Sequence, residues 1–343
     1  MLDTEITRLA AVRAGNQNEF AALIEPYRRE LLAHCYRMLG SAVEAEDIVQ
    51  ETFLRAWRRL DTFQQPVSFR AWLYRIATNA CLDTLDKQRR RTLPTLAYPA
   101  ADPHSTMAPP IYDRVWLEPI PDEWLVQPES ENPETRFSIR ESVTLAFVAA
   151  LQCLPPRQRA VLILRDVLDW PASETAELLT FTVSAVNSTL HRARRTLALH
   201  YQREERRPSL ENTATRRLLE RYVRAWETAD VAGLLALLKE EATFVMPPWP
   251  AWYHGREDIR AFLEKDVFNN TPADYARLIP LRGNARPGFA LYHWDISRAE
   301  YLPFAIQLLT IEGQSGQLAD ILNFVGAEFF PVFGLPPSLP ASG

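Results

Sequence analysis

The chain has 343 residues, which is enough for two or three domains. Its apolar fraction of 47% and charged fraction of 24% are those of an ordinary globular protein. The formal net charge of −5 argues against a protein that coats nucleic acid by charge alone, so any nucleic-acid surface must be local.

The cysteines Cys35, Cys81 and Cys153 lie far apart, and no C-x-x-C or clustered His/Cys spacing occurs. A structural zinc or a disulfide framework is therefore not expected, and each cysteine is predicted to fill core. No apolar run follows a basic N-terminus, and no stretch of 18 apolar residues occurs. We therefore expect a cytoplasmic protein without a membrane segment.

Residues 11–91 have a helical pattern throughout, because apolar residues recur at steps of three and four. Gly40 separates the first pair of helices, and Ser68 is the expected N-cap of the last one. The segment ends in a basic run, Lys87–Arg91.

Residues 92–136 are rich in proline and in acidic side chains, which indicates an extended linker rather than a packed helix. One apolar island, Trp116–Leu125, interrupts this composition. Its two tryptophans and its aliphatic residues would be costly to leave in water. We expect the linker to dock on another surface through this island, with the following contact residues: Trp116, Pro119, Pro121 and Trp124.

Residues 137–203 return to helical periodicity. A short helix after Pro171, a tight turn and a second helix form a helix-turn-helix pattern, with Ser173 as a cap for the first helix. Thr180 stands where such a turn usually has glycine. The second helix is expected to bury a seam of residues three and four apart: Val183, Val186, Leu190, Ala193 and Leu197.

Residues 208–335 have an α+β pattern, and residues 336–343 are expected to form a loose tail. Helices are expected at about 213–228, 230–238 and 255–264. Strands are expected in this part at 289–296 and 304–311. The predicted fold class is multidomain, with two all-α helical domains, the second carrying the helix-turn-helix, followed by an α+β domain.

Three motifs in this order carry a family resemblance. Asp47–Trp57 resembles the polymerase-binding helix of bacterial sigma factors, and Phe69–Asn79 resembles the −10 promoter helix that follows it. Leu154–Arg159, with the helix-turn-helix after it, resembles their −35 reading domain. The chain is most similar to the extracytoplasmic-function (ECF) group, and residues 208–335 resemble a SnoaL-like α+β cone. The resemblance implies sigma region 2 at 11–91 and sigma region 4 at 137–203.

The polymerase-binding resemblance falls on one helical face, because its residues lie at i, i+3, i+4 and i+7. These residues are Asp47, Gln50, Glu51 and Leu54. An acidic, hydrogen-bonding edge beside an apolar seam suits a basic partner helix, whereas the alternative is an ordinary solvated face. The resemblance implies binding to the β and β′ subunits of the RNA polymerase core.

The resemblance also places the pocket for an unpaired −10 base near Phe63 and Asn79. Such a base must leave its stack and be held by stacking and by hydrogen bonds at its edge. The alternatives are core packing for Phe63 and Trp72 and a surface pair for Arg75 and Asn79. The expected −10 contacts are Phe63, Arg70, Trp72, Arg75, Asn79, Lys87, Arg89 and Arg90.

The second helix of the helix-turn-helix has an outward face that suits DNA. Its short polar residues near the N-terminal end suit base edges, and its basic residues further along suit phosphates. The family often has a basic residue at the positions of Asn187 and Thr189, so this chain is expected to read a different −35 sequence. The alternative is a solvated amphipathic helix. The expected −35 contacts are Ser184, Asn187, Ser188, His191, Arg192 and Arg195.

Some relatives of the SnoaL-like cone are enzymes that use an Asp/His/Tyr cluster for acid–base chemistry. The candidates in this chain are His254, Tyr292, His293, Asp295 and Asp320. The more ordinary interpretation is that they are core polar groups or surface residues. We expect no catalytic residue, no metal site and no cofactor, and we leave open a small-molecule ligand in this domain.

The leading hypothesis is a sigma factor that binds core RNA polymerase and promoter DNA, initiates transcription and is regulated in cis by its SnoaL-like domain. The acidic linker would then lie in a basic polymerase channel that nucleic acid normally occupies. One alternative is a ligand-responsive DNA-binding regulator that does not associate with polymerase. The other is a SnoaL-like cyclase or isomerase fused to a DNA-binding module.

Overall fold

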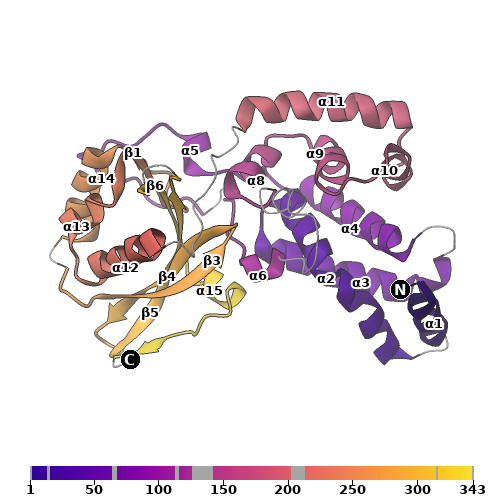
Figure 1. Cartoon of the computed structure of the whole chain (residues 1–343), viewed down its shortest axis with the longest axis horizontal. Helices are drawn as coiled ribbons and strands as arrows, with labels where there is room; N and C mark the ends of the chain where they lie inside the picture. Colours follow the sequence, from indigo (N-terminus) through magenta and orange to yellow (C-terminus); the bar gives the residue numbers. More distant parts are fainter. Residues whose placement is uncertain are drawn as a thin grey trace. The chain divides into compact units, whose positions relative to one another are not determined.

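The computed structural model describes residues 2–13, 16–63, 68–112, 116–125, 142–201, 213–269, 271–313 and 316–341. The chain divides into two compact units (Figure 1). The helical unit comprises residues 1–91 and 123–202, and the C-terminal unit comprises residues 92–122 and 203–343. We call residues 92–122 the strap.

The first half of the helical unit consists of α1 (Leu2–Arg13), α2 (Gln17–Leu39), α3 (Ala42–Arg58) and α4 (Phe69–Leu85), with a 3₁₀ turn at Leu60–Thr62. Side chains cap three of these helices at their N-termini, as such ends require: the caps are Asn16, Ser41 and Ser68. Gly40 ends α2 with a φ of 74°, a left-handed conformation that glycine adopts without strain. The predicted helix boundaries at Gly40 and Ser68 are thus confirmed.

The second half of the helical unit contains α8 (Leu145–Gln152), α9 (Pro156–Leu162), α10 (Ala172–Leu179) and α11 (Val183–His200). A π-helical turn, Ile163–Val167, extends α9, and the short α6 (Asp122–Leu125) begins at the last residue of the strap. Pro171 stands at the N-cap of α10, so the predicted cap Ser173 lies inside that helix.

A sheet of seven strands forms the C-terminal unit. The strands are β1 (Leu238–Val245), β2 (Trp252–His254), β3 (Ala276–Gly283), β4 (Arg286–Asp295), β5 (Glu300–Ile311), β6 (Leu318–Val325) and β7 (Leu339–Pro340). Their order is β2-β1-β6-β5-β4-β3, with β7 paired to β5. Among these pairs, β1 and β6 run parallel and all the others run antiparallel. The parallel pair places the first strand of the unit beside a strand from near its end.

Helices cover the sheet through large aromatic side chains. They are α12 (Thr213–Glu227), α13 (Val231–Leu235), α14 (Arg256–Phe262, extended by a π-helical turn Leu263–Val267) and α15 (Phe329–Val332). Tyr222 of α12 stacks on Phe289 of β4 at 5.5 Å between ring centres, and Phe262 of α14 stacks on Tyr253 at 4.3 Å. Phe330 of α15 packs edge-on against Tyr292. Helices thus close a core made of contiguous apolar residues.

Two boundaries differ from the sequence-based expectation. The linker was expected to be a separate segment over 92–136, but residues 92–122 belong to the C-terminal unit, while residues 126–136 lie outside the described part. The tail was expected to be loose from residue 336, but Leu339 and Pro340 pair with Tyr301 and Glu300 of β5. In both cases hydrogen-bonding groups of the sheet unit, far away in the sequence, supply partners that no local pattern reveals.

Cys35 and Cys81 are fully buried, as predicted, whereas Cys153 is partly exposed and accepts a hydrogen bond from Arg90. Within the described ranges, no helix is both long enough and apolar enough to cross a bilayer. Those same ranges contain no cluster of His, Cys, Asp and Glu side chains that suits a metal ion.

Candidate nucleic-acid interface

The predicted polymerase-binding face lies on α3, opposite the buried side of that helix. Asp47 and Gln50 are exposed, and Leu54 is 51% exposed. Glu51 is partly buried and pairs with Arg55 at 2.7 Å. The face therefore combines carboxylates with one apolar side chain in contact with water.

A groove of about 490 Å³ runs beside this face, and α2 forms its other wall. Its lining residues are Phe20, Ile24, Arg28, Gln50, Phe53, Leu54 and Trp57. Arg28 lies over the ring of Phe53 at 5.3 Å and pairs with Glu46 at 3.2 Å. The sequence analysis missed the contribution of α2, because periodicity within one helix does not show which helix packs beside it.

The predicted −10 residues separate into an exposed group and a packed group. Phe63 is 4% exposed, and its ring packs against Phe69 at 5.5 Å and Trp72 at 5.3 Å. Arg70 pairs with Glu30 at 2.8 Å and lies 5.0 Å from the ring of Tyr74. Phe63 and Arg70 thus have intramolecular partners in this structure, and their roles in −10 binding stay predictions.

The exposed group remains available to nucleic acid. Arg75 and Asn79 are exposed on α4, and Trp72 is partly exposed. Lys87, Arg89 and Arg90 are exposed after the end of α4, although Arg90 donates to the Cys153 sulfur. These side chains supply positive charge, one amide and one aromatic face.

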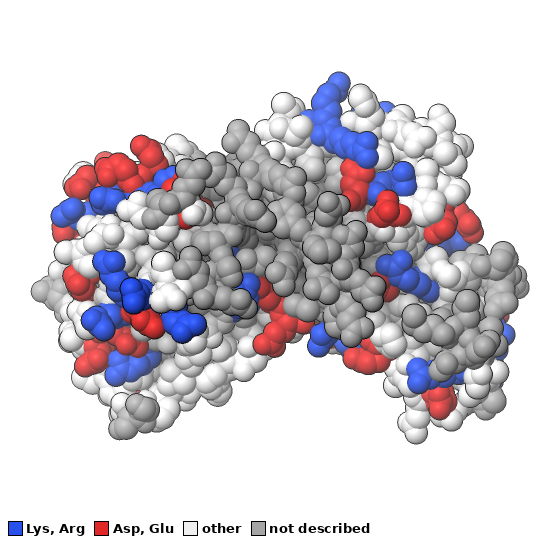
Figure 2. All heavy atoms as spheres, in the orientation of Figure 1, with Lys and Arg blue, Asp and Glu red and all other residues white. Residues whose placement is uncertain are grey.

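The outward face of α11 matches its prediction. Val186, Thr189, Leu190 and Ala193 are buried, whereas Val183 is 45% exposed, so the predicted seam begins one turn too early. Figure 2 shows basic side chains gathered over the outer surface of this helix. The predicted contact residues Ser184, Asn187, Ser188, His191, Arg192 and Arg195 are all exposed.

Three features fix the helix-turn-helix geometry. Thr180 ends α10 in the left-handed conformation, with φ 59° and ψ 44°, and Thr182 caps α11 by accepting from the amide of Ala185 at 3.1 Å. Arg194 makes two hydrogen bonds to Asp166, at 2.7 and 2.8 Å. The turn therefore keeps its usual conformation although it lacks the usual glycine.

The strap binds the sheet of the C-terminal unit through backbone and side-chain hydrogen bonds at the turn between β3 and β4. The Ile120 amide donates to Asn284 Oδ1, and the Asn284 amide donates to the Ile120 carbonyl, each at 3.0 Å. Asp122 accepts from the Ala285 amide at 2.7 Å and pairs with Arg282 at 3.1 Å. This end of the strap therefore packs against the turn between β3 and β4.

The rest of the strap is held near β2 and α14. The Trp252 indole donates to the Tyr98 carbonyl at 2.9 Å, and the Ala101 amide donates to the Trp252 carbonyl at 2.8 Å. Lys265 donates to the Ser105 carbonyl at 2.6 Å. Of the predicted docking residues, Trp116, Pro119 and Pro121 are buried in this unit, whereas Trp124 is partly exposed and belongs to the helical unit.

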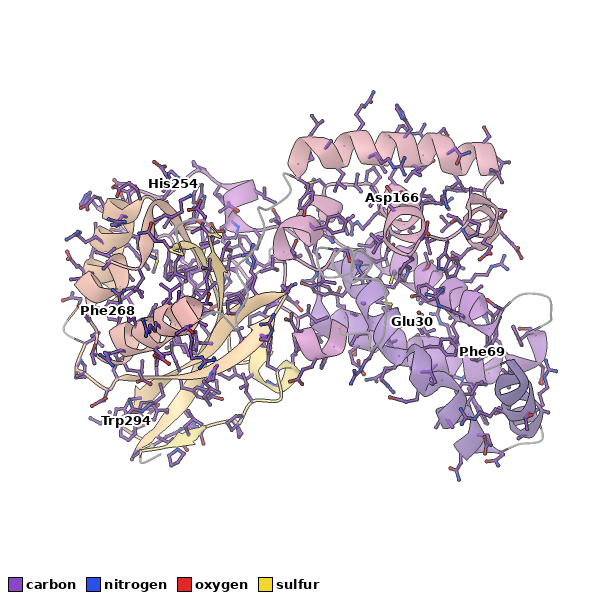
Figure 3. All side chains as sticks on the ribbon, viewed as in Figure 1. Glu30, Phe69, Asp166, His254, Phe268 and Trp294 are labelled. Carbon is purple, nitrogen blue, oxygen red and sulfur yellow. The ribbon has the colours of Figure 1, made fainter. Side chains whose placement is uncertain are left out.

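The candidate catalytic residues of the cone do not converge. Asp295, the last residue of β4, is partly exposed and accepts from Ser297 and Arg298, and Asp320 accepts from Thr243 at 2.6 Å. The Tyr292 hydroxyl donates to the Pro336 carbonyl, and His293 stacks on Phe304 at 3.8 Å. Figure 3 shows His254 and Trp294, the neighbour of Asp295, at widely separated places in the unit. No acid–base pair forms among these five side chains.

Comparison with known proteins assigns the family. Residues 23–91 match sigma-70 region 2, residues 144–197 match sigma-70 region 4, and residues 219–300 match a SnoaL-like domain. Over 325 residues the chain is 43% identical to the ECF RNA polymerase sigma factor SigG of Mycobacterium tuberculosis, covering 94% of this chain and 85% of that protein. The chain belongs to the ECF sigma factors.

Two further similarities agree with this assignment. SigW of Bacillus subtilis is 31% identical over 191 residues, which cover 55% of this sigma factor and 92% of SigW. The crystal structure of SigJ from Mycobacterium tuberculosis aligns with a TM-score of 0.55 at 20% identity, covering 94% of this chain and all of that one, and therefore shows a shared fold. A sigma factor is a non-enzymatic subunit for transcription initiation, so the two alternative hypotheses fall away.

Regions 2 and 4 of this sigma factor pack together through buried arginines. Arg159 of α9 is 2% exposed and donates to carbonyl groups of Met38, Gln152 and Leu154. Arg37 of α2, equally buried, donates to the Ser142 hydroxyl at 2.8 Å. Burial lowers the pKa of Arg159 to about 9 and the pKa of Arg37 to about 10, so both stay charged at neutral pH. Sequence reasoning missed both residues, since neither belongs to an exposed basic patch.

Thr180→Gly is expected to stabilise the sigma factor. A left-handed conformation costs a residue with a β-carbon about 1 kcal/mol, which glycine avoids. Thermal unfolding of the full chain should shift upward by a few degrees. The matched control, Glu177→Gly at an exposed position within α10, should shift it downward, because glycine weakens a helix interior. A lower melting temperature for Thr180→Gly would contradict this account.

Acidification is expected to destabilise the C-terminal unit through His293. Burial lowers the pKa of this imidazole to about 4, from 6.5 in the unfolded chain. Between these values the unfolded state binds the additional proton, so the free energy of unfolding falls as pH drops from 6.5 to 4, by on the order of 2 kcal/mol. Calorimetry across this range should show a weaker pH dependence for His293→Gln, whereas the exposed control His254→Gln should keep the parent dependence. Equal dependence in all three proteins would exclude His293 as the cause.

Proposed function

We propose that this sigma factor contacts core polymerase through the exposed α3 face, reads the −10 element with α4 and the −35 element with α11, and is restrained in cis by its C-terminal domain. The pairing of the strap with the β3–β4 hairpin carries the proposal for cis regulation. The assignment of core polymerase and promoter DNA as partners rests on the solvent exposure of the α3, α4 and α11 faces.

The α3 face is suited to a basic helix of the polymerase core. Asp47 and Gln50 offer acceptors at the surface, and Leu54 offers the apolar contact that a stable interface needs. The adjoining groove would receive an apolar side chain of the partner between Phe20, Phe53 and Trp57.

Promoter recognition is proposed to use the exposed residues alone. On α4 these are Arg75 and Asn79, followed by the basic residues at 87, 89 and 90. On α11 the short side chains of Ser184, Asn187 and Ser188 come first, where a recognition helix meets base edges. This N-terminal part of α11 carries no basic side chain, so its attraction to DNA phosphates is weak. Binding of region 4 to DNA is therefore proposed to depend on core polymerase, which holds region 2 at the −10 element.

The path of the chain supports the proposal of cis regulation. The strap connects region 2, which ends at Arg91, to the segment that leads into region 4. Its hydrogen bonds with Asn284, Ala285 and Trp252 hold this connection on the C-terminal domain. A strap bound there cannot lie in a polymerase channel, so docking of the strap is proposed to oppose transcription.

The same domain is proposed to bind a small molecule that sets the strength of this restraint. Its interior holds buried polar atoms that lack a hydrogen-bond partner among the described residues: Tyr275 OH, His293 Nε2, Gln307 Nε2 and Asn323 Oδ1. Each is costly when unpaired, so a polar ligand that reached them would be stabilised.

Asp47→Arg combined with Glu51→Arg is expected to weaken capture of core polymerase at least tenfold, because like charges would then face the basic partner. Capture on immobilised polymerase subunits measures the effect. Glu220→Arg on α12 makes the same type of change at an exposed position of the C-terminal unit and should leave capture unchanged. Undiminished capture by the double variant would show that another face binds.

Ile120→Ala is expected to release the strap and to raise promoter-specific transcription with core polymerase in vitro. The side chain is fully buried, and its truncation costs about 2–5 kcal/mol of local packing. Leu96→Ala removes a strap side chain that is 51% exposed and should have no effect. A chain ending before Glu211 should be as active as Ile120→Ala or more so.

The opposite outcome is equally clear. A fall in transcription with Ile120→Ala, while circular dichroism shows an intact fold, would mean that the domain assists polymerase engagement. The absence of promoter-specific transcripts from the full chain and from the chain truncated near Arg207 would refute the assignment of the promoter-reading faces.

A further inference from the structure

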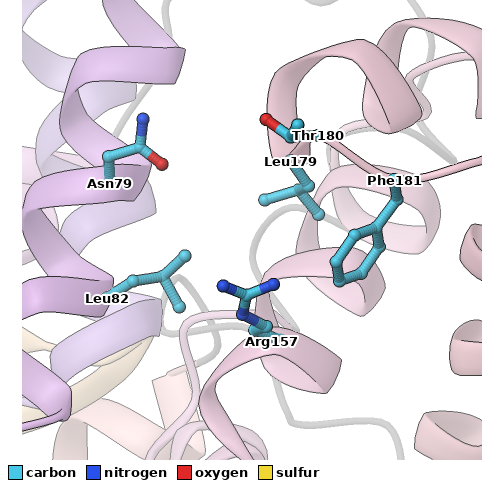
Figure 4. Close-up of a pocket in the computed structure, with 6 residues that line it drawn as sticks. All are labelled: Asn79, Leu82, Arg157, Leu179, Thr180 and Phe181. Carbon is cyan, nitrogen blue, oxygen red and sulfur yellow. The ribbon is translucent and has the colours of Figure 1, made fainter.

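A pocket of about 290 Å³ lies where region 2 meets region 4 (Figure 4). One wall is α4, which contributes Asn79 and Leu82. The facing wall consists of Arg157 on α9 and of the end of α10 with its turn, Leu179, Thr180 and Phe181. Figure 4 shows Asn79 and Thr180 directed toward the same space from opposite sides.

The lining divides into one cation, two neutral polar groups and an apolar floor. The Arg157 guanidinium lies over the Phe181 ring at 5.5 Å, while Leu82 and Leu179 add aliphatic surface. Among the residues described, Arg157 forms no ion pair with a carboxylate, and no Asp or Glu lines the pocket. Within the described lining of the pocket, the guanidinium is therefore the only charged group, and its flat face and its donors suit a planar anion.

We propose that this pocket binds a small aryl carboxylate. The carboxylate would take the edge of the Arg157 guanidinium, and the aromatic ring would lie against Phe181, Leu82 and Leu179. Ring substituents would meet the Asn79 amide and the Thr180 hydroxyl. The volume is at the lower end of the range for ligand sites, which suits a single ring and excludes a dinucleotide.

Occupancy of this pocket would oppose promoter recognition, an argument that rests on the proposed function. The −10 and −35 elements are about 25 base pairs apart, roughly 85 Å of duplex. Region 2 and region 4 must separate to read both elements at once, so a molecule that contacts both walls binds only the packed arrangement. By linkage, a free ligand concentration of ten times Kd shifts the equilibrium toward the packed arrangement about tenfold.

Titration calorimetry on the full chain tests the site, with benzoate as the probe. Benzoate should bind with a Kd on the order of 1 mM, as its size allows. Acetate, which lacks the ring, and benzyl alcohol, which lacks the charge, should each bind at least tenfold more weakly. Sodium benzoate should also reduce promoter-specific transcription relative to equal sodium acetate.

Variants decide whether the binding belongs to this pocket. Arg157→Gln and Phe181→Leu should each weaken benzoate binding at least tenfold, while Arg221→Gln, an exposed arginine of α12, should not. Phe181→Leu keeps an apolar side chain, and unfolding curves check that each variant is folded. Benzoate binding that survives Arg157→Gln, or equal binding of acetate, would overturn the proposal.

The two proposals fail in different ways. Arg157-dependent benzoate binding by a chain that yields no promoter-specific transcripts would refute the promoter-reading assignment and leave the site standing. Normal transcription without benzoate binding, or binding without inhibition, would refute the regulatory site.

Discussion

The reciprocal hydrogen bonds between Ile120 and Asn284 constrain the rest of the molecule, because they hold the connection between the two promoter-reading regions on a third domain. Proline has no backbone N–H, so a proline-rich strap has few donors for hydrogen bonds to a neighbouring strand. Ile120 provides both a donor and an acceptor between Pro119 and Pro121, and its side chain is fully buried. A short segment thereby acquires a defined register on the β3–β4 hairpin.

The contact between regions 2 and 4 has a different chemical character. Arg37 and Arg159 are buried there, and the groups that receive their hydrogen bonds are backbone carbonyls, a hydroxyl and an amide. Burying a cation without a carboxylate is costly, as the lowered pKa values of both residues show. Of the Arg159 acceptors, only the Met38 carbonyl lies across the contact, because Gln152 and Leu154 directly precede α9. A few specific hydrogen bonds therefore define the geometry of this interface.

Sequence reasoning succeeded where a single helix carries the information. The exposed faces of α3 and α11 follow from spacing alone, and the caps at Ser68 and Gly40 follow from local chemistry. It failed where the partner lies elsewhere in the chain: Glu30 engages Arg70, forty residues away, and Phe69 and Trp72 enclose Phe63. The parallel pairing of β1 with β6 and the attachment of the strap to Asn284 were equally beyond a local pattern. Long-range contacts, rather than propensities, decided each of these positions.

The parallel pairing of β1 with β6 also sets an order of events during synthesis. β1 cannot complete its ladder until residues 318–325 have left the ribosome, and the strap has no hairpin to bind before β3 and β4 are made. Regions 2 and 4 are complete by residue 202. At about 5–20 residues per second, the remaining chain takes on the order of ten seconds. Each newly made molecule therefore passes through an interval in which regions 2 and 4 exist and the C-terminal domain does not.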